Sequence, residues 1–183
     1  MRIKTYIILF IMFFPIVCLA QDLKPYSCRV SLYVSAKNDS FKGKIESYIT
    51  RELRSLGDVT VTDDKPDWVL YILALETYIK GGQKAGVILS TTVLKPFNNK
   101  LLLNMVNEKF KEVVSKSTSG ILEHRDNWLQ IGSPSNLRSI CNEIVADFDS
   151  QWIKPEREHR QKEIDSQFKE IDSQLKELIN KKK

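Results

Sequence analysis

The feature that most constrains the fold is an uninterrupted apolar run of eight residues in the middle of the chain. It reads Trp68-Val69-Leu70-Tyr71-Ile72-Leu73-Ala74-Leu75. Successive side chains of a strand point to opposite faces of its sheet, and here both alternating sets are apolar. Such a strand is typical of a sheet interior that is covered on both faces. We therefore expect a central strand, with its second face covered by residues 101–116, by the C-terminal tail or by another molecule.

The first twenty residues are organised like a secretory signal peptide. Arg2 and Lys4 give a positive start, fifteen uncharged residues follow, and the small Ala20 precedes the polar Gln21. A membrane-spanning helix needs about 20 apolar residues, whereas a shorter apolar stretch after a basic start is typical of a cleaved leader. The sequence predicts a signal peptide over 1–20, cleavage after Ala20, and an exported protein in the periplasm or outside the cell.

Cys18 leaves a lipid anchor as an alternative to a soluble exported protein. A lipoprotein signal also ends in a cysteine, but the bulky Val17 stands before Cys18, where such signals carry a small residue. We therefore favour the soluble form. Contact with a membrane is expected only if the chain is lipid-anchored.

The charge balance disfavours a nucleic-acid partner. The chain has 28 basic and 23 acidic residues, and losing Arg2 and Lys4 with the leader lowers its net charge from +5 to +3. Nucleic-acid-binding domains gather a basic excess on one face. Neither residues 21–153 nor the tail concentrates basic residues in that way, so no nucleic acid is expected to bind.

Apolar periodicity predicts a single α+β domain over residues 21–153. In chain order the sequence predicts a strand at 28–35, a helix at 40–56, a short strand at 59–62, the apolar strand at 68–75, a hairpin tip at 81–84, a strand at 87–94, a helix at 101–116, an edge strand at 121–131, and a second amphipathic helix after the turn at 132–135. For residues 101–116 a strand is the alternative. The expected architecture is a mixed, mainly antiparallel sheet with two packed amphipathic helices and a C-terminal polar helix.

One part of this layout resembles known modules. The segment 30–75, which ends in Pro66-Asp67-Trp68-Val69-Leu70, is similar in layout to small α/β modules of bacterial envelope-assembly proteins. These modules include the amino-terminal domain of the Tol-system propeller protein and the curli-export lipoprotein. The similarity covers about a quarter of the chain. It rests on no diagnostic motif, and no functional residue is carried over from it.

Two cysteines remain after the leader is removed, Cys28 and Cys141, and both lie on apolar faces of their predicted elements. Disulfides persist in exported proteins, while free cysteines are among the most buried residues. A disulfide between Cys28 and Cys141 and a pair of buried thiols are therefore both open. No Cys-x-x-Cys or paired histidine motif accompanies them, so neither a metal nor another cofactor is expected.

The tail, residues 154–183, is predicted to be a charged amphipathic helix with a short heptad repeat. The sequence KEIDSQF at 162–168 is followed directly by KEIDSQL at 169–175. Apolar residues recur at spacings of four and three, as in a coiled-coil seam, at Ile164, Phe168, Ile171, Leu175 and Leu178. This seam is the predicted partner contact. The helix folds back on its own domain, self-associates or docks on another protein, or lies on a membrane surface.

The sequence contains little that indicates catalysis. His124 stands in the polar segment Glu123-His124-Arg125-Asp126 of the expected edge strand, and a surface histidine is the simpler interpretation. No zinc-peptidase or hydrolase nucleophile motif occurs. We therefore expect an exported, non-catalytic interaction or assembly module. The alternatives are a small-ligand or envelope-surface binder that uses Lys80 and Lys84 of the hairpin loop 80–85, and a hydrolase with a site near His124.

Overall fold

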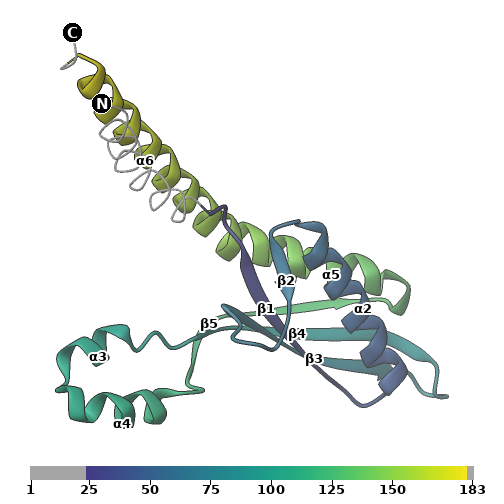
Figure 1. Ribbon diagram of the computed structural model, residues 1–183. Helices are drawn as coiled ribbons and strands as arrows, with labels where there is room; N and C mark the ends of the chain where they lie inside the picture. Colours follow the sequence, from purple (N-terminus) through teal and green to yellow (C-terminus); the bar gives the residue numbers. More distant parts are fainter. Residues whose placement is uncertain (1–23, 181–183) are drawn as a thin grey trace, which may run out of the picture. The chain divides into compact units, whose positions relative to one another are not determined.

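The fold is built on a five-stranded sheet with the strand order β2-β1-β3-β4-β5 (Figure 1). The strands are β1 (Cys28–Ala36), β2 (Val59–Val61), β3 (Trp68–Tyr78), β4 (Lys84–Pro96) and β5 (Leu122–Gly132). β1 runs parallel to both of its neighbours, β2 and β3. The longer pairs, β3 with β4 and β4 with β5, are antiparallel. The predicted α+β class with a mixed, mainly antiparallel sheet is confirmed.

This computed structural model describes residues 24–180. The signal peptide predicted at 1–20 lies outside the described residues. The chain divides into two compact units, of which one, Ser27–Gln151, holds the whole sheet; the described part of the other consists of residues 24–26 and 152–180. No helix within residues 24–180 is long and apolar enough to cross a membrane.

Two amphipathic helices pack together on one face of the sheet (Figure 1). The first, α2 (Asp39–Ser55), begins after Asn38, whose side chain accepts a hydrogen bond from the Phe41 backbone N–H at 3.1 Å. Such a cap satisfies one of the free donors at a helix start. Its buried residues recur every four positions, at Phe41, Ile45, Ile49 and Leu53. The second helix, α5 (Leu137–Phe148), follows a 3₁₀ turn at Pro134–Asn136.

An aromatic pair lies at the centre of the core. Trp68 of β3 and Phe148 of α5 meet edge to face, with ring centroids 6.0 Å apart and planes at 83°. Both side chains are buried. The ammonium group of Lys95 lies 4.3 Å from the centroid of the Trp68 ring. The inner face of the sheet and the buried stripes of α2 and α5 therefore form one core.

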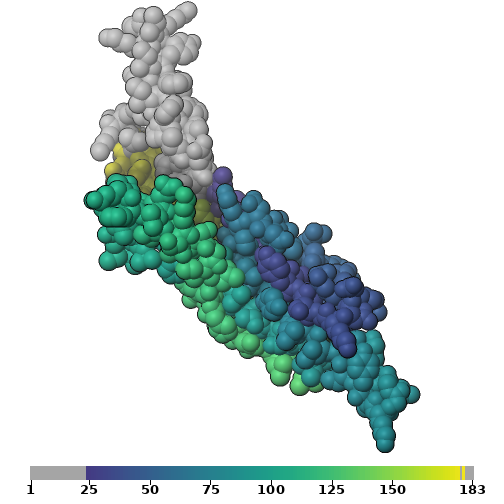
Figure 2. All heavy atoms as spheres, turned by 90° about the horizontal axis from the view of Figure 1, so that it is seen from below, coloured from purple at the N-terminus to yellow at the C-terminus, as the bar shows by residue number. Residues whose placement is uncertain are grey.

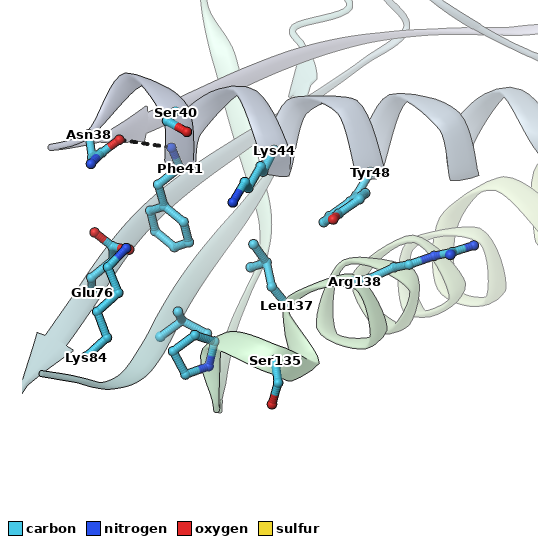
Figure 3. Close-up of a pocket in the computed structure, with 12 residues that line it drawn as sticks. Asn38, Ser40, Phe41, Lys44, Tyr48, Glu76, Lys84, Ser135, Leu137 and Arg138 are labelled. Carbon is cyan, nitrogen blue, oxygen red and sulfur yellow. Dashed lines mark hydrogen bonds and ion pairs between the residues drawn. The ribbon is translucent and has the colours of Figure 1, made fainter.

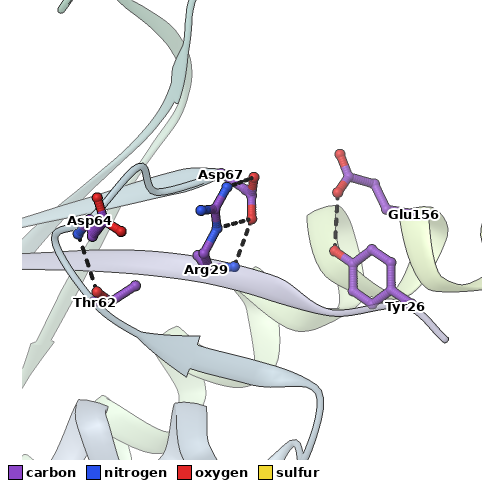
Figure 4. A network of polar contacts seen from close by, with 6 residues as sticks. All are labelled: Tyr26, Arg29, Thr62, Asp64, Asp67 and Glu156. Atoms are coloured by element: carbon purple, nitrogen blue, oxygen red, sulfur yellow. Dashed lines mark hydrogen bonds and ion pairs between the residues drawn. The ribbon is translucent and has the colours of Figure 1, made fainter. Parts of the chain in front are cut away.

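A salt bridge joins the starts of β1 and β3 (Figure 4). The Arg29 backbone N–H donates to Asp67 Oδ2 at 2.9 Å, and the Arg29 guanidinium donates to Asp67 Oδ1 at 3.3 Å. The Asp67 N–H in turn donates to the Arg29 carbonyl at 2.7 Å. These bonds set the parallel register where the two strands begin.

Residues 101–116 are helical, as favoured, but in two pieces. These are α3 (Lys100–Met105) and α4 (Glu108–Thr118), and the side chain of Asn107 caps the second by accepting from the Lys109 N–H at 3.3 Å. Neither helix contains a buried residue. Both lie beyond the ends of β4 and β5, at the left of Figure 1. They therefore cover neither face of the sheet.

The strand at 68–75 is central in the sheet, as predicted, but residues 101–116 do not cover its second face. Leu70 and Ile72 point into the core and are fully buried, whereas Tyr71, Leu73 and Leu75 are 43%, 43% and 49% exposed. The physical reason is that α2 and α5 lie on the same face and α3 and α4 lie beyond the strand ends. Within Ser27–Gln151, no described helix lies on the second face beside Tyr71, Leu73 and Leu75, although Val69, at the start of the strand on the same side, is buried.

The tail is the long helix α6 (Lys154–Asn180), which follows a π-helical turn at Asp149–Ile153. Its surface is polar and carries ion pairs at helical spacing, such as Lys176 with Asp172 at 2.5 Å. Pairs of this kind add a few tenths of a kcal/mol each, about 0.2–0.5. The predicted C-terminal polar helix is confirmed.

Candidate interaction surface

The outer sheet face is the surface of the sheet opposite α2 and α5, and Figure 2 shows it with the bands of β1, β3, β4 and β5 side by side. The name is used here for its central part, whose outward register positions are Tyr33, Ser35, Tyr71, Leu73, Leu75, Ile88, Ser90, Thr92, Asn127, Leu129 and Ile131. Toward the start of β1 the same side continues with Arg29, Ser31, Val69, Leu94 and His124. None of the eleven central residues is charged. The six large ones that the structure leaves open, Tyr33, Tyr71, Leu73, Leu75, Leu129 and Ile131, are 43–69% exposed. Contiguous apolar patches of this kind mark contact sites.

The strand register arranges these side chains in three rows across the sheet. The first row is Ser35, Leu73, Ser90 and Leu129; the second is Tyr33, Tyr71, Thr92 and Asn127; the third is Leu75, Ile88 and Ile131. Residues of one row are direct partners on neighbouring strands, so their side chains are in contact. The face is therefore ridged, with large and small residues alternating in the first row.

β5 forms one edge of the sheet, so the predicted edge position of residues 121–131 is confirmed. The first half of β5 is charged, and Arg125 forms an ion pair with Glu123. The indole N–H of Trp128 donates to Asp126 Oδ2 at 3.0 Å. Charges on an edge strand discourage pairing with another chain. The second half, from Asn127 onward, carries no charge.

His124 lies on β5 opposite Leu94 and is exposed. The described residues contain no group of three or more His, Cys, Asp and Glu side chains able to hold a metal. Within residues 24–180, His124 makes no hydrogen bond to an acidic side chain. The hypothesis of a hydrolase site near His124 therefore stays a prediction. No hydrogen-bonded acidic group within the described residues supports it.

The hairpin tip predicted at 81–84 is confirmed, and two glycines make it possible. Gly81 and Gly82 have φ angles of +104° and +80°, which side chains with a Cβ rarely adopt. Lys84 forms an ion pair with Glu76, and Tyr78 donates a hydrogen bond to the same carboxylate at 2.9 Å. The hydrogen bond from Lys84 holds the pKa of Glu76 below its usual value. Lys84 therefore already has a counter-charge.

Lys80 is exposed at the tip of the same hairpin. The ligand-loop hypothesis named both lysines. Within the described chain, Lys84 is paired with Glu76, and no acidic partner is seen for Lys80. A role of Lys80 and Lys84 in binding anionic groups stays a prediction.

A cavity of about 190 Å³ lies between the start of α2, the base of the hairpin and the start of α5 (Figure 3). Three cationic side chains, Lys44, Lys84 and Arg138, line it together with Glu76 and Tyr48. Ligand pockets usually measure about 300–1,000 Å³. The cavity is therefore smaller than a usual ligand site, and its lining contains no histidine or cysteine that could act as a nucleophile or base.

No disulfide joins Cys28 and Cys141, and both are thiols, which is the second of the two alternatives that the sequence left open. Cys28 begins β1 and Cys141 lies in α5, and both are buried. Burial raises the pKa of the Cys141 thiol to about 12. A thiol with this pKa stays protonated at neutral pH and is a poor nucleophile.

The buried thiol predicts a loss of stability at high pH. The unfolded chain releases the Cys141 proton near the ordinary thiol pKa, while the folded chain keeps it until about 12. Above about pH 9, the free energy of unfolding should therefore fall by up to about 1.4 kcal/mol per pH unit from this group. Urea unfolding at several pH values measures the slope. Cys141→Ala should show a shallower slope, and identical slopes would contradict the assignment.

The structure places the predicted seam on α6. Ile164 is buried, Ile171 is half-buried, and Phe168 and Leu175 are 55% and 44% exposed. Leu178 lies in α6, but its side chain is outside the described part. Within the same unit, the Tyr26 hydroxyl donates to Glu156 Oε2 at 3.1 Å (Figure 4). A partner contact through this seam stays a prediction.

Sequence reasoning missed the outer sheet face as a candidate site. The signal was present in the outward set of residues 87–94, where Ile88, Ser90 and Thr92 contain no charged side chain. An outward set in contact with water usually includes charged residues. An uncharged outward set beside the apolar run could have indicated a contact surface.

No protein-family model and no curated protein matches the chain. Among solved structures, it is similar to the PelC dodecamer from Paraburkholderia phytofirmans, at 16% identity and a TM-score of 0.39 over 70% of this chain and 89% of that one. It is also similar to a minor lipoprotein from Acinetobacter baumannii, at 16% identity and a TM-score of 0.33 over 70% of this chain and 92% of that one. Similarity at this level does not define a shared function.

Proposed function

We propose that the chain is an exported, non-catalytic interaction module that binds a protein through the outer sheet face. The observation that carries this proposal is the face itself: eleven outward residues on four strands, none charged, with six large side chains 43–69% exposed. Export rests on the leader pattern of residues 1–20.

The free energy available on this face supports a binding role. Fully burying a Leu, Ile or aromatic side chain gains about 1.5–3 kcal/mol, so burying the exposed half of one gains about 1 kcal/mol. Six such side chains therefore offer roughly 6 kcal/mol to a partner. The same area left in water is a solubility cost that a protein without a partner would not need to carry.

The non-catalytic part of the proposal is supported by the surroundings of the candidate groups. The cavity beside Lys44 and Arg138 is small, and His124 has no acidic hydrogen-bond partner within the described residues. The buried thiol of Cys141 is protonated at neutral pH. None of these groups is paired with a neighbour in the manner that general acid–base or nucleophilic catalysis needs.

The test is the size of the protein in an extract of the cells that naturally make it. Wild type should elute above its monomer mass. Leu73→Glu combined with Leu129→Glu should elute as a monomer, because two carboxylates on the face would have to be buried without a counter-charge. Val113→Glu on α4 is the matched control, since Val113 is 61% exposed and lies off the face. Equal elution of wild type and the double variant would contradict the proposal.

A further inference from the structure

We infer that the partner of the outer sheet face is a second copy of this chain. The two copies are related by a two-fold axis that runs along the strands, midway between the stacked sheets and between β3 and β4. The inference rests on the proposed function, since it names the partner for the same surface.

The charge on the face restricts the partner. The whole chain is 28% charged, yet the eleven residues of the outer sheet face include no charged side chain, and the neighbouring Arg29 is already paired with Asp67. A charged partner surface would lose its hydration here and gain no opposite charge. A second outer sheet face is itself uncharged, so the two surfaces meet without that cost. Charge complementarity therefore favours an identical, uncharged surface.

The row that contains Leu73 fits its own reversed copy. From β1 to β5 the row is Ser35, Leu73, Ser90, Leu129, which is small, large, small, large. The two-fold axis reverses this order in the second copy, so β3 lies over β4 and β1 lies over β5. Leu73 then stacks on Ser90 of the second copy, and Leu129 stacks on Ser35 of the second copy. Each ridge meets a hollow.

The next row fits in the same way. Its order is Tyr33, Tyr71, Thr92, Asn127, so the reversal places Tyr71 on Thr92 of the second copy and Tyr33 on Asn127 of the second copy. Each pair joins a large ring to a smaller residue, and each has hydroxyl or amide groups to form the hydrogen bonds that buried polar groups require. In the third row, Leu75 meets Ile88 of the second copy.

Moving the axis by half a strand spacing removes this fit. An axis directly over β3 would stack Leu73 on Leu73 of the second copy and Ser35 on Ser90 of the second copy. Protein interiors are closely packed, so a clash beside a void would be unfavourable. The alternation of sizes therefore specifies the axis between β3 and β4. An interface of this kind is self-complementary, as two-fold dimers require.

The area of the face matches what a dimer needs. With about 200 Å² for each whole residue, as for aromatic residues, the exposed fractions of the six large residues sum to about 600 Å² per copy. Stable complexes bury about 800 Å² per partner. The five remaining residues of the face add to the area from the six large ones. Two stacked outer sheet faces therefore reach the area that stable complexes usually bury.

The first test is the oligomeric state of the purified protein, expressed as the full chain with its own leader. Sedimentation equilibrium should give a concentration-dependent dimer for wild type and for Val113→Glu, and a monomer for Leu73→Glu. A wild type that is monomeric at every concentration overturns the inference. So does a dimer that survives Leu73→Glu but dissociates with Ile171→Asp and Leu175→Asp, because the contact would then be on α6.

These outcomes separate the inference from the proposed function. If the purified chain is monomeric while the complex in the native extract depends on the face, the second copy is overturned and the interaction module remains. If the extract shows no complex and the purified protein is monomeric, both fail.

The second test checks the register through Ser35→Cys combined with Leu129→Cys. Within one chain these positions are three strand spacings apart, about 14 Å, whereas the dimer places them opposite each other. A short bis-maleimide should therefore give a covalent dimer with the double variant and little with either single variant. The buried Cys28 and Cys141 should not react in the folded protein. Cross-linking of the double variant no stronger than that of the single variants overturns this register.

Discussion

Phe148→Ala is expected to lower the free energy of unfolding by about 3–5 kcal/mol. Phe148 is fully buried and meets Trp68 edge to face at 6.0 Å. The substitution removes both the buried ring and its aromatic contact, and it leaves a cavity between α5 and β3. The free energy of unfolding of a native protein is about 5–15 kcal/mol in total, so the substitution would remove a large part of it. Urea unfolding followed by tryptophan fluorescence measures the change.

Phe110→Ala provides the matched control for this measurement. Phe110 is on α4 and is 52% exposed, so the same chemical change there should alter the free energy of unfolding by no more than about 0.5 kcal/mol. Similar losses for Phe148→Ala and Phe110→Ala would mean that α4 is packed in the folded protein, contrary to its position here.

Ile72→Asp is expected to abolish the folded state, while Leu73→Asp next to it leaves the fold intact. Ile72 is fully buried on the inner face of β3, and Leu73 is 43% exposed on the outer face. An unpaired carboxylate in the core costs several kcal/mol, about 3–5 or more, which is comparable with the whole stability. Far-ultraviolet circular dichroism and a thermal melt distinguish the two variants.

The Leu73→Asp melt needs a dilute sample. The stability that a dimer adds rises with the logarithm of the protein concentration, so a concentrated wild type would appear more stable than a monomeric variant for that reason alone. In dilute solution the two melts should agree closely. If Ile72→Asp folds and Leu73→Asp does not, the two faces of β3 have been assigned the wrong way round.

The local elements could be predicted because their signals are local. Asn38 as a cap, the apolar spacing of α2, and Gly57 with a φ of +80° just after it fix that helix within one residue of the predicted range. The hairpin tip at Gly81 and Gly82 follows from the same kind of short-range signal. Turn chemistry and periodicity depend on neighbours in the sequence, so they can be recognised without tertiary contacts.

The cover of the second sheet face could not be predicted. The outward side chains of β3 are apolar, as they would be beneath a helix of the same chain. The hydrophobic effect favours apolar residues equally whether a helix of the chain or a second molecule covers them. Composition therefore identifies a face that needs a partner and does not identify the partner. The register does more, since only paired strands bring Leu73 beside Ser90 and so produce the alternating row.

The choice between a disulfide and two thiols stayed open in the sequence for a related reason. Cys28 and Cys141 are both buried, as predicted, and a disulfide depends in addition on the distance between their Cα atoms. The inward side of an element is visible in the sequence, and the distance between two elements is not. Glu76 and Lys84 show the opposite case, because the hairpin predicted around 81–84 brings these two residues together.

The rate at which a maleimide labels Ser90→Cys, followed as the protein concentration is raised, tests most directly whether the outer sheet face is a contact between copies. Ser90 lies at the centre of the face and the substitution is small. We predict fast labelling in dilute protein and strong protection in concentrated protein, with no protection in the Leu73→Glu background and none at Ser47→Cys on α2. A labelling rate at Ser90→Cys that does not change with concentration would mean that the outer sheet face is not a contact between copies.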